Sequence, residues 1–307
     1  MQEVDGDGRA LLANVVRAYP DAVWLADVDD TIVDTVRMHD EASRSIVSVL
    51  ASFVGDRKAN DVVGRFEEIF GILIESHQSS EPKIERSQQE KDDLLTRIAE
   101  YQQEITARWR TTKKFSRETL LKIAGEDCGI DLTSEQIHQC IDHYWQHVLS
   151  HPLCFDDAIG LTQVLAKVGL PLFLMTSSDG RLTLNENGQF DYDPASSRRF
   201  KESRVQSLRA EGLYYREVFV GDPIDKPTRE FFQLVYDGVE RHLGRRLNPQ
   251  HAVVMGDSYT SDLQIPVSEW KVGLGVLYRP GQKDIIVERD RVVSVGNWKA
   301  VGNFLVS

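Results

Sequence analysis

The sequence has few cysteines, no basic segment at its start and no long apolar run. Its three cysteines, Cys128, Cys140 and Cys154, follow no regular spacing. Such usage indicates reduced thiols in a cytoplasmic protein rather than a disulfide framework. Residues 1–5 are acidic and no apolar stretch follows a basic one, so no signal peptide is expected. No run approaches the roughly 18 apolar residues that indicate a membrane span. We therefore expect a cytoplasmic protein that neither spans nor binds a membrane.

Positive charge is also scarce relative to negative charge. The formal net charge is -12 at pH 7, whereas nucleic-acid-binding domains usually carry a basic patch. We therefore expect no nucleic-acid partner. An anionic substrate would need a local cation, either a metal ion or a specific lysine or arginine.

The order of apolar segments predicts an α/β protein. Short apolar runs typical of buried parallel strands occupy residues 23–28, 171–176, 218–220, 252–255, 272–278 and 292–295. Helical patterns lie between them, which predicts a doubly wound, Rossmann-like parallel sheet. Residues 35–151 show only helical patterns, and this segment is too long for a crossover connection. We therefore predict an α/β core of residues 1–34 and 152–307, with an inserted helical domain of residues 35–151.

Three segments between the strands carry more detailed predictions. Residues 134–149 form an amphipathic pattern with Ile137, Ile141, Tyr144 and Val148 on one face, and Thr133 or Ser134 is a suitable N-cap. Residues 81–110 are charged on most faces, which predicts a long solvent-exposed helix. Residues 179–204 are polar and predict a long loop or a hairpin.

Polar side chains follow successive strands of the predicted sheet. Ligands of open α/β sheets bind at the carboxyl ends of the strands, which meet at one edge. Like charges crowded there are costly without a cation among them, and carboxylate oxygens are ligands that Mg²⁺ prefers. A carboxylate nucleophile, a second acid, hydroxyls and a lysine are also what phosphoryl transfer requires. The residues concerned are Asp27, Asp29, Asp30, Thr31, Thr176, Ser177, Lys226, Asp257 and Asp262.

The order of these motifs resembles the haloacid dehalogenase (HAD) superfamily of phosphohydrolases. The resemblance rests on the segments 27–31 (DVDDT), 175–177 (MTS), 226–227 (KP) and 256–262 (GDSYTSD). It implies a covalent aspartyl-phosphate, Mg²⁺ as cofactor and a small phosphorylated metabolite as substrate. The helical insertion falls where this family places its helical cap, between the first and second motifs.

The resemblance also implies a role for each matching residue. Asp27 would be the nucleophile and a Mg²⁺ ligand, and Asp29 would be the general acid/base and bind Mg²⁺ through its carbonyl. Thr176 and Ser177 would bind phosphate. Lys226 would steady both nucleophile and phosphate, and Asp257 and Asp262 would complete the metal site. An acid at position 29 favours a phosphate ester, whose leaving oxygen must be protonated, over a haloacid or a phosphonate.

Two positions depart from the family pattern. Asp30 stands where the family usually has glycine, which makes the local turn unusual. Asp262 lies one residue further beyond Asp257 than the commoner spacing, so either Asp262 reaches the metal or Ser261 replaces it in a weaker role.

Other functions fit parts of the same pattern. A phosphomutase of the same family would use the same residues but retain the phosphoryl group for a second hydroxyl. A receiver-type signalling domain also groups acids, a threonine and a lysine at strand ends, although the helical insertion and Asp29 speak against it. A non-catalytic protein that binds a phosphorylated ligand is a further alternative.

Two clusters lie outside the motifs. Cys140, His143, His147 and His151 recur at helical spacing and could share one face, but without a ligand from a second segment an exposed helix face is favoured over a zinc site. Arg198, Arg199, Lys201 and Arg204 form a basic cluster. Such a cluster usually marks a solvated segment, and the alternative is a contact for a second anionic group on the substrate. The sequence does not indicate an oligomeric state.

Overall fold

The computed structural model describes residues 8–78 and 88–306, and the chain divides into two units. The α/β unit contains the described residues up to Asp34, Leu153–Ser177, and those from Glu202 onward. The helical unit contains Thr35–Pro152 and Ser178–Lys201. None of the described helices combines the length and the apolar stretch that crossing a membrane requires.

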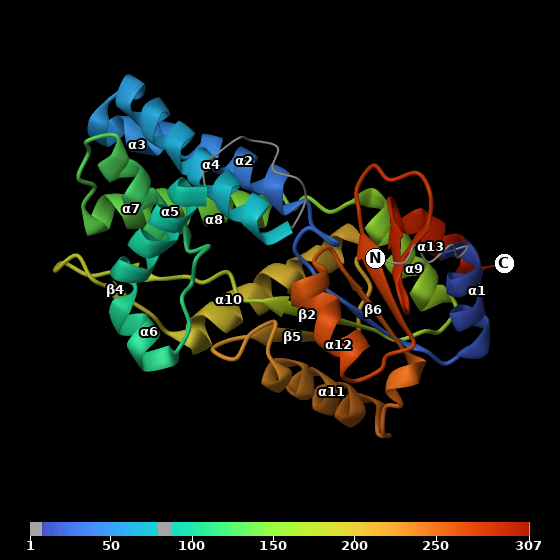
Figure 1. Cartoon of the computed structure of the whole chain (residues 1–307). Helices are drawn as coiled ribbons and strands as arrows, with labels where there is room; N and C mark the ends of the chain where they lie inside the picture. The colour runs from blue at the N-terminus through green and yellow to red at the C-terminus, as the bar shows by residue number, and fades with distance from the viewer. Residues whose placement is uncertain (1–7, 79–87, 307) are drawn as a thin grey trace. The chain divides into compact units, whose positions relative to one another are not determined.

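A seven-stranded sheet forms the α/β unit, in the order β5-β2-β1-β6-β7-β9-β8 (Figure 1). Every pair in it is parallel except β8 with β9. This confirms the predicted doubly wound sheet, and it adds β8, an edge strand whose largely exposed residues alternate too weakly to predict. The strands are β1 (Val23–Ala26), β2 (Leu172–Ser177), β5 (Val218–Gly221), β6 (Ala252–Gly256), β7 (Leu274–Tyr278), β8 (Ile286–Arg289) and β9 (Val292–Val295).

Helices cover the sheet of this unit because its central strands are apolar on both faces, with all residues of β1, β6 and β7 buried. On one side, α11 packs Phe232, Val235 and Val239 into a core that includes Leu25 and Val254. The helices α9 and α13 pack against each other. The helices are α1 (Gly8–Ala18), α9 (Asp156–Lys167), α11 (Arg229–Leu243), α12 (Gln264–Ser268) and α13 (Trp298–Leu305), with the π-helix η3 (Tyr259–Leu263) and the 3₁₀ turns η1 (Leu208–Glu211) and η2 (Pro249–His251).

The helical unit is built from the helices between Thr35 and Pro152. The predicted N-cap is Thr133, which begins α8 with a capping box to Gln136, and the apolar face of α8 is buried through Ile137, Ile141 and Tyr144. The helices are α2 (Thr35–Ser45), α3 (Val47–Val54), α4 (Asp56–Gln78), α5 (Gln88–Tyr101), α6 (Gln103–Trp109), α7 (Arg117–Asp127) and α8 (Ser134–Ser150).

Residues 81–110 are not the single exposed helix that their charge predicts. From Gln88 on they form α5 and α6, and Leu94, Ile98 and Ile105 are buried against the rest of the helical unit. These three apolar residues are enough to bury one face of each helix, because both helices are short and each has only a narrow apolar stripe. Residues 81–87 of this prediction lie outside the described residues.

Residues 178–201 correct the predicted domain boundary, because they belong to the helical unit and not to the α/β core. They form the hairpin of β3 (Thr183–Leu184) and β4 (Phe190–Asp191) and the start of α10 (Pro194–Ser207). The amide of Leu184 donates to Nε2 of His138 over 3.1 Å, and its carbonyl accepts from Ser134. These hydrogen bonds to α8 hold the hairpin in the helical unit, and no local sequence pattern predicts them.

Candidate active site

The carboxyl ends of three neighbouring strands carry the predicted site residues. Strand β1 lies between β2 and β6, with Leu25 beside Phe173 and Val254. Asp27 follows β1, and its amide donates to the Met255 carbonyl of β6 over 2.9 Å. Parallel pairing in this register therefore places Asp27 next to Asp257, the residue directly after β6.

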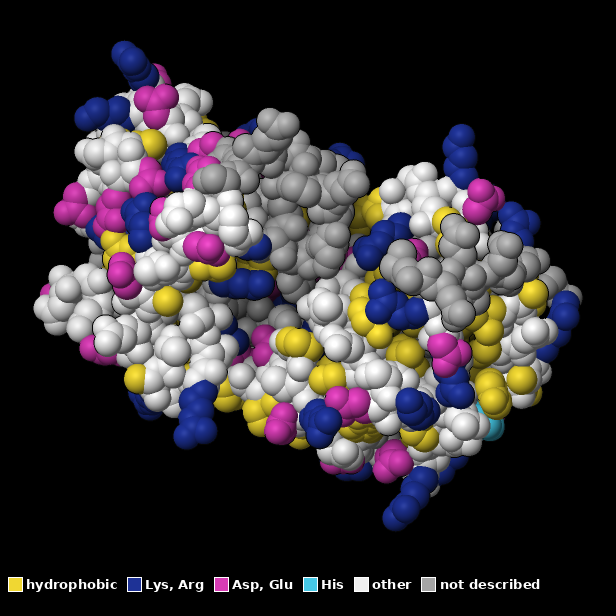
Figure 2. All heavy atoms as spheres, in the orientation of Figure 1, with side chains coloured by type: hydrophobic (Ala, Val, Ile, Leu, Met, Phe, Trp, Pro, Cys, Tyr) yellow, Lys and Arg dark blue, Asp and Glu magenta, His cyan; other side chains and the backbone are white. Residues whose placement is uncertain are grey.

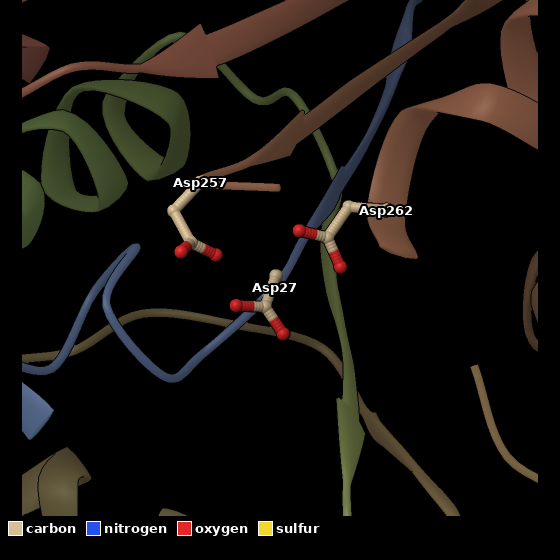
Figure 3. A group of neighbouring side chains, drawn as sticks. All are labelled: Asp27, Asp257 and Asp262. Atoms are coloured by element: carbon tan, nitrogen blue, oxygen red, sulfur yellow. The ribbon is translucent and has the colours of Figure 1, made fainter. Parts of the chain in front are cut away.

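Three carboxylates converge at this edge of the sheet. Oxygen atoms of Asp27, Asp257 and Asp262 all lie within 4.8 Å of one another (Figure 3). The three residues are only 4%, 8% and 1% exposed, respectively. Buried carboxylates at this spacing repel one another, and hard divalent cations bind such oxygen clusters. The three residues could therefore hold a cation.

Lys226 supplies a positive charge to this cluster. Its Nζ donates to Oδ1 of Asp262 over 2.7 Å and to Oδ1 of Asp27. The lysine lies in the loop between β5 and α11, ahead of the N-cap Thr228. Pro227 thus precedes the helix.

Burial and crowding shift the protonation of these groups. Burial, together with the neighbouring Asp262 and Asp29 charges, raises the pKa of Asp27 to about 7, despite the opposing effect of Lys226. Burial and the charges of Asp262, Asp27 and Asp30 raise the pKa of Asp257 well above its usual range. The single positive charge of Lys226 therefore does not balance the negative charge of three buried carboxylates.

Asp29 and the end of β2 form the second part of the site. The hydroxyl of the buried Thr176 lies 3.5 Å from Oδ2 of Asp29 and 3.2 Å from the Ser177 carbonyl. Ser177 donates its hydroxyl to Oδ1 of Asp225 over 2.7 Å. The Asp29 side chain is 31% exposed, so this carboxylate is the one that solvent reaches most easily.

Two contacts of the site could not be read from the sequence. Asp225 accepts from both Ser177 and the backbone amide of Lys226, the latter over 2.7 Å, and so connects two predicted motifs. Nη2 of Arg204 donates to Oδ1 of Asp29 over 2.7 Å. The only sequence signal for Arg204 was its place in a basic cluster, and nothing singled out Asp225.

Comparison with known proteins places this architecture among solved structures, although no family model and no curated protein matches the sequence. The protein YfnB of Bacillus subtilis, assigned as a HAD hydrolase and crystallised with magnesium, matches with a TM-score of 0.54 and 15% identity, covering 93% of this chain and 99% of that one. A Thermotoga maritima protein assigned as a β-phosphoglucomutase matches with a TM-score of 0.54 and 17% identity, covering 93% and 98%. The chain has the haloacid dehalogenase fold.

The backbone conformation of Asp30 accounts for its unusual turn. Its φ angle is 58°, in the left-handed region, which glycine adopts freely and asparagine and aspartate tolerate better than other residues. The Asp30 amide donates to the Val33 carbonyl over 2.8 Å. Asp30 thus forms the turn for which HAD proteins usually have glycine.

The second departure from the HAD pattern is the extra residue before Asp262. Residues Tyr259–Leu263 form a π-helix, which has more residues per turn than an α-helix and thereby accommodates one extra residue. Asp262 is buried in the carboxylate cluster and accepts from the Ser258 amide over 3.1 Å.

The rival metal site on α8 gains no support. Within the described ranges, the Asp27, Asp257 and Asp262 group is the only set of three or more potential His, Cys, Asp or Glu ligands that lie close enough to hold an ion. His147 and His151 stack on each other, with ring centroids 4.4 Å apart, and Cys140 is buried.

Proposed function

We propose that the protein is a Mg²⁺-dependent phosphatase that hydrolyses a small phosphate ester through an aspartyl-phosphate on Asp27. The observation that carries this proposal is the position of Asp27. Its carboxylate lies close to those of Asp257 and Asp262 and contacts the ammonium of Lys226. Two residues further along the chain, the carboxylate of Asp29 lies 3.5 Å from the hydroxyl of Thr176 at the end of β2.

The residues present fit a magnesium ion. Asp27, Asp257 and Asp262 supply hard oxygen ligands. Burial, together with the neighbouring carboxylates, raises the pKa values of Asp27 and Asp257, and a bound cation would favour their charged forms. These carboxylates, with the Asp29 carbonyl, would hold the ion. When bound, Mg²⁺ would neutralise charge on the transferring phosphoryl group.

In the first step, a carboxylate oxygen of Asp27 forms a bond to phosphorus while the bond from phosphorus to the ester oxygen breaks. Asp29 gives its proton to the leaving oxygen. Lys226, which already contacts Asp27, holds the nucleophile in place and neutralises phosphate charge. The hydroxyls of Thr176 and Ser177 bind phosphate oxygens.

In the second step, Asp29 takes a proton from water and the resulting hydroxide oxygen bonds to phosphorus. The bond between phosphorus and Asp27 breaks, which releases phosphate and regenerates both carboxyl groups. A phosphomutase would use the same first step and pass the phosphoryl group to a second hydroxyl, so product analysis for isomers separates the two.

On the face shown in Figure 2, acidic and basic side chains are interspersed, which supports a small-molecule substrate rather than nucleic acid.

The test is hydrolysis of p-nitrophenyl phosphate with Mg²⁺. Wild type should release phosphate, and Asp27→Asn should lower kcat by at least about a thousandfold because the nucleophile is lost. Asp290→Asn is a matched control, since the Asp290 side chain is 96% exposed. Equal rates for wild type and Asp27→Asn would contradict the assigned nucleophile, and halide release from a 2-haloacid in place of phosphate release would favour a dehalogenase.

A further inference from the structure

The basic cluster of the sequence separates into different environments in the structure. Arg198 and Arg199 are exposed on α10. Lys201 is fully buried and binds Asp179 over 3.0 Å within the helical unit. Of the four basic residues, Arg204 alone lies in the α/β unit.

Arg204 is held against the residue that the proposed function makes the general acid. Its side chain is 5% exposed, and its Nη2 donates to Oδ1 of Asp29 over 2.7 Å. In the proposed first step, Asp29 must lie within hydrogen-bond distance of the leaving oxygen. A guanidinium in direct contact with Asp29 therefore lies beside the leaving group, and not beside the transferring phosphoryl group that Lys226 serves.

A guanidinium at this place suits a second anion on the substrate. It is always charged and carries five N–H donors in a planar fork that matches carboxylate and phosphate oxygens. Its Nη2 contacts Asp29, so a substrate anion bound here would share the positive charge with this carboxylate. Burial strengthens its attraction for an anion, and a chain of net charge -12 otherwise repels one.

Resting on the proposed phosphatase function, we propose that Arg204 selects phosphate esters whose leaving group carries a second anionic group, a carboxylate or a phosphate, close to the ester oxygen. A substrate anion there shares the guanidinium with Asp29. An ester with a neutral leaving group leaves the buried guanidinium without this interaction, so it binds and reacts more weakly.

The experiment compares three esters of similar size. Phosphoglycolate carries a carboxylate next to the ester carbon, ethylene glycol bisphosphate carries a second phosphate, and ethyl phosphate carries neither. Wild type should prefer at least one anionic ester by about tenfold or more in kcat/KM, since hydrogen bonds to charged groups have this effect on affinity. Of the two anionic esters, the one with the higher kcat/KM shows whether carboxylate or phosphate is the recognised group.

Arg204→Gln should reduce this preference, measured as the ratio of kcat/KM values within the variant, to within about threefold, and Arg204→Lys should retain part of the preference. Arg199→Gln is the matched control on the exposed face of the same helix and should behave as wild type. Equal kcat/KM values for all three esters in wild type, which needs no altered side chain and no assumption about folding, would overturn the proposal.

Binding to Asp27→Asn, measured by calorimetry with Mg²⁺, separates this proposal from the phosphatase function. Tighter binding of an anionic ester than of ethyl phosphate supports the role of Arg204 even if wild type turns over none of the esters, a result that would refute only the phosphatase. Hydrolysis of p-nitrophenyl phosphate together with equal binding of the three esters refutes the role of Arg204 and leaves the phosphatase intact.

Discussion

The ammonium of Lys226 lies 2.7 Å from Oδ1 of Asp262 and also contacts Asp27. One buried cation therefore serves two of the three carboxylates in the cluster, while Asp257 has its carboxyl group directed at the same space (Figure 3). Burial alone would lower the pKa of Lys226, but the charges of Asp262 and Asp27 outweigh it and raise this pKa. The lysine stays charged, and the excess negative charge falls on Asp27 and Asp257.

This excess predicts how the stability of the metal-free protein depends on pH. Asp27 has a pKa of about 7 in the folded protein against 3.8 as its ordinary value, so between these values the folded state binds more protons than the unfolded state. The free energy of unfolding should fall as pH rises through this window, by at most about 1.4 kcal/mol per pH unit for each such carboxylate. Thermal unfolding at pH 5 and pH 7.5 in EDTA measures the fall.

Two comparisons assign that fall to the carboxylate cluster. Asp27→Asn should show a shallower decline because it removes one titrating group, whereas the exposed Asp290→Asn should decline as wild type does. Adding Mg²⁺ at pH 7.5 should recover much of the lost stability, because an ion that binds only the folded state stabilises it. An identical pH dependence with and without Mg²⁺ would show that the cluster does not bind the ion.

Gly256 and Asp262 are in close contact, which gives a second prediction. A Cβ atom at position 256 would collide with the carboxylate and Cβ of Asp262. Gly256→Ala should therefore displace Asp262 from the cluster, weaken Mg²⁺ binding by about tenfold or more, and destabilise the protein by about 1–3 kcal/mol through overpacking. Calorimetric titration with Mg²⁺ and denaturant unfolding measure the two effects.

Gly160 supplies the control for that substitution. It lies in α9 of the same unit, and a Cβ there would meet nothing within 4 Å. Gly160→Ala should keep Mg²⁺ affinity unchanged and gain about 0.5–1 kcal/mol of stability from better helix propensity. Unchanged Mg²⁺ affinity in Gly256→Ala would show that the position of Asp262 is not required for binding the ion.

The sequence predicted the parallel sheet and the residues at its edge because both depend on local patterns. Buried parallel strands are short apolar runs, and their carboxyl ends necessarily meet, so Asp27, Thr176 and Asp257 could be grouped without coordinates. The contacts missed depend on tertiary packing. Arg204 reaches Asp29 across 175 positions of the chain, and neither residue carries a local sign of the other.

The same distinction applies to boundaries and loops. The hairpin Thr183–Asp191 looks like part of a loop in the α/β core, yet its hydrogen bond to His138 places it in the helical unit. The extra residue before Asp262 could be counted from the sequence, but its accommodation by a π-helix depends on the backbone conformation of Tyr259–Leu263.

Asp30 offers a test that separates backbone conformation from side-chain chemistry. Its φ of 58° disfavours residues other than glycine, and its charge raises the pKa of the nearby Asp257. Asp30→Gly removes both costs. It should raise the free energy of unfolding of the metal-free protein by up to about 1 kcal/mol, while p-nitrophenyl phosphate hydrolysis should stay within about threefold of wild type.

Two further variants divide that gain between its two causes. Asp30→Asn keeps a side chain that tolerates the left-handed conformation and removes only the charge, so its gain measures the relief of Asp257. Asp30→Val removes the charge but places a β-branched residue in a conformation that it rarely adopts, so it should lose about 1–2 kcal/mol relative to Asp30→Asn. Loss of hydrolysis in both Asp30→Gly and Asp30→Asn, with folding intact, would instead assign the Asp30 carboxylate a part in the chemistry, because neither change strains the turn that carries Asp27 and Asp29.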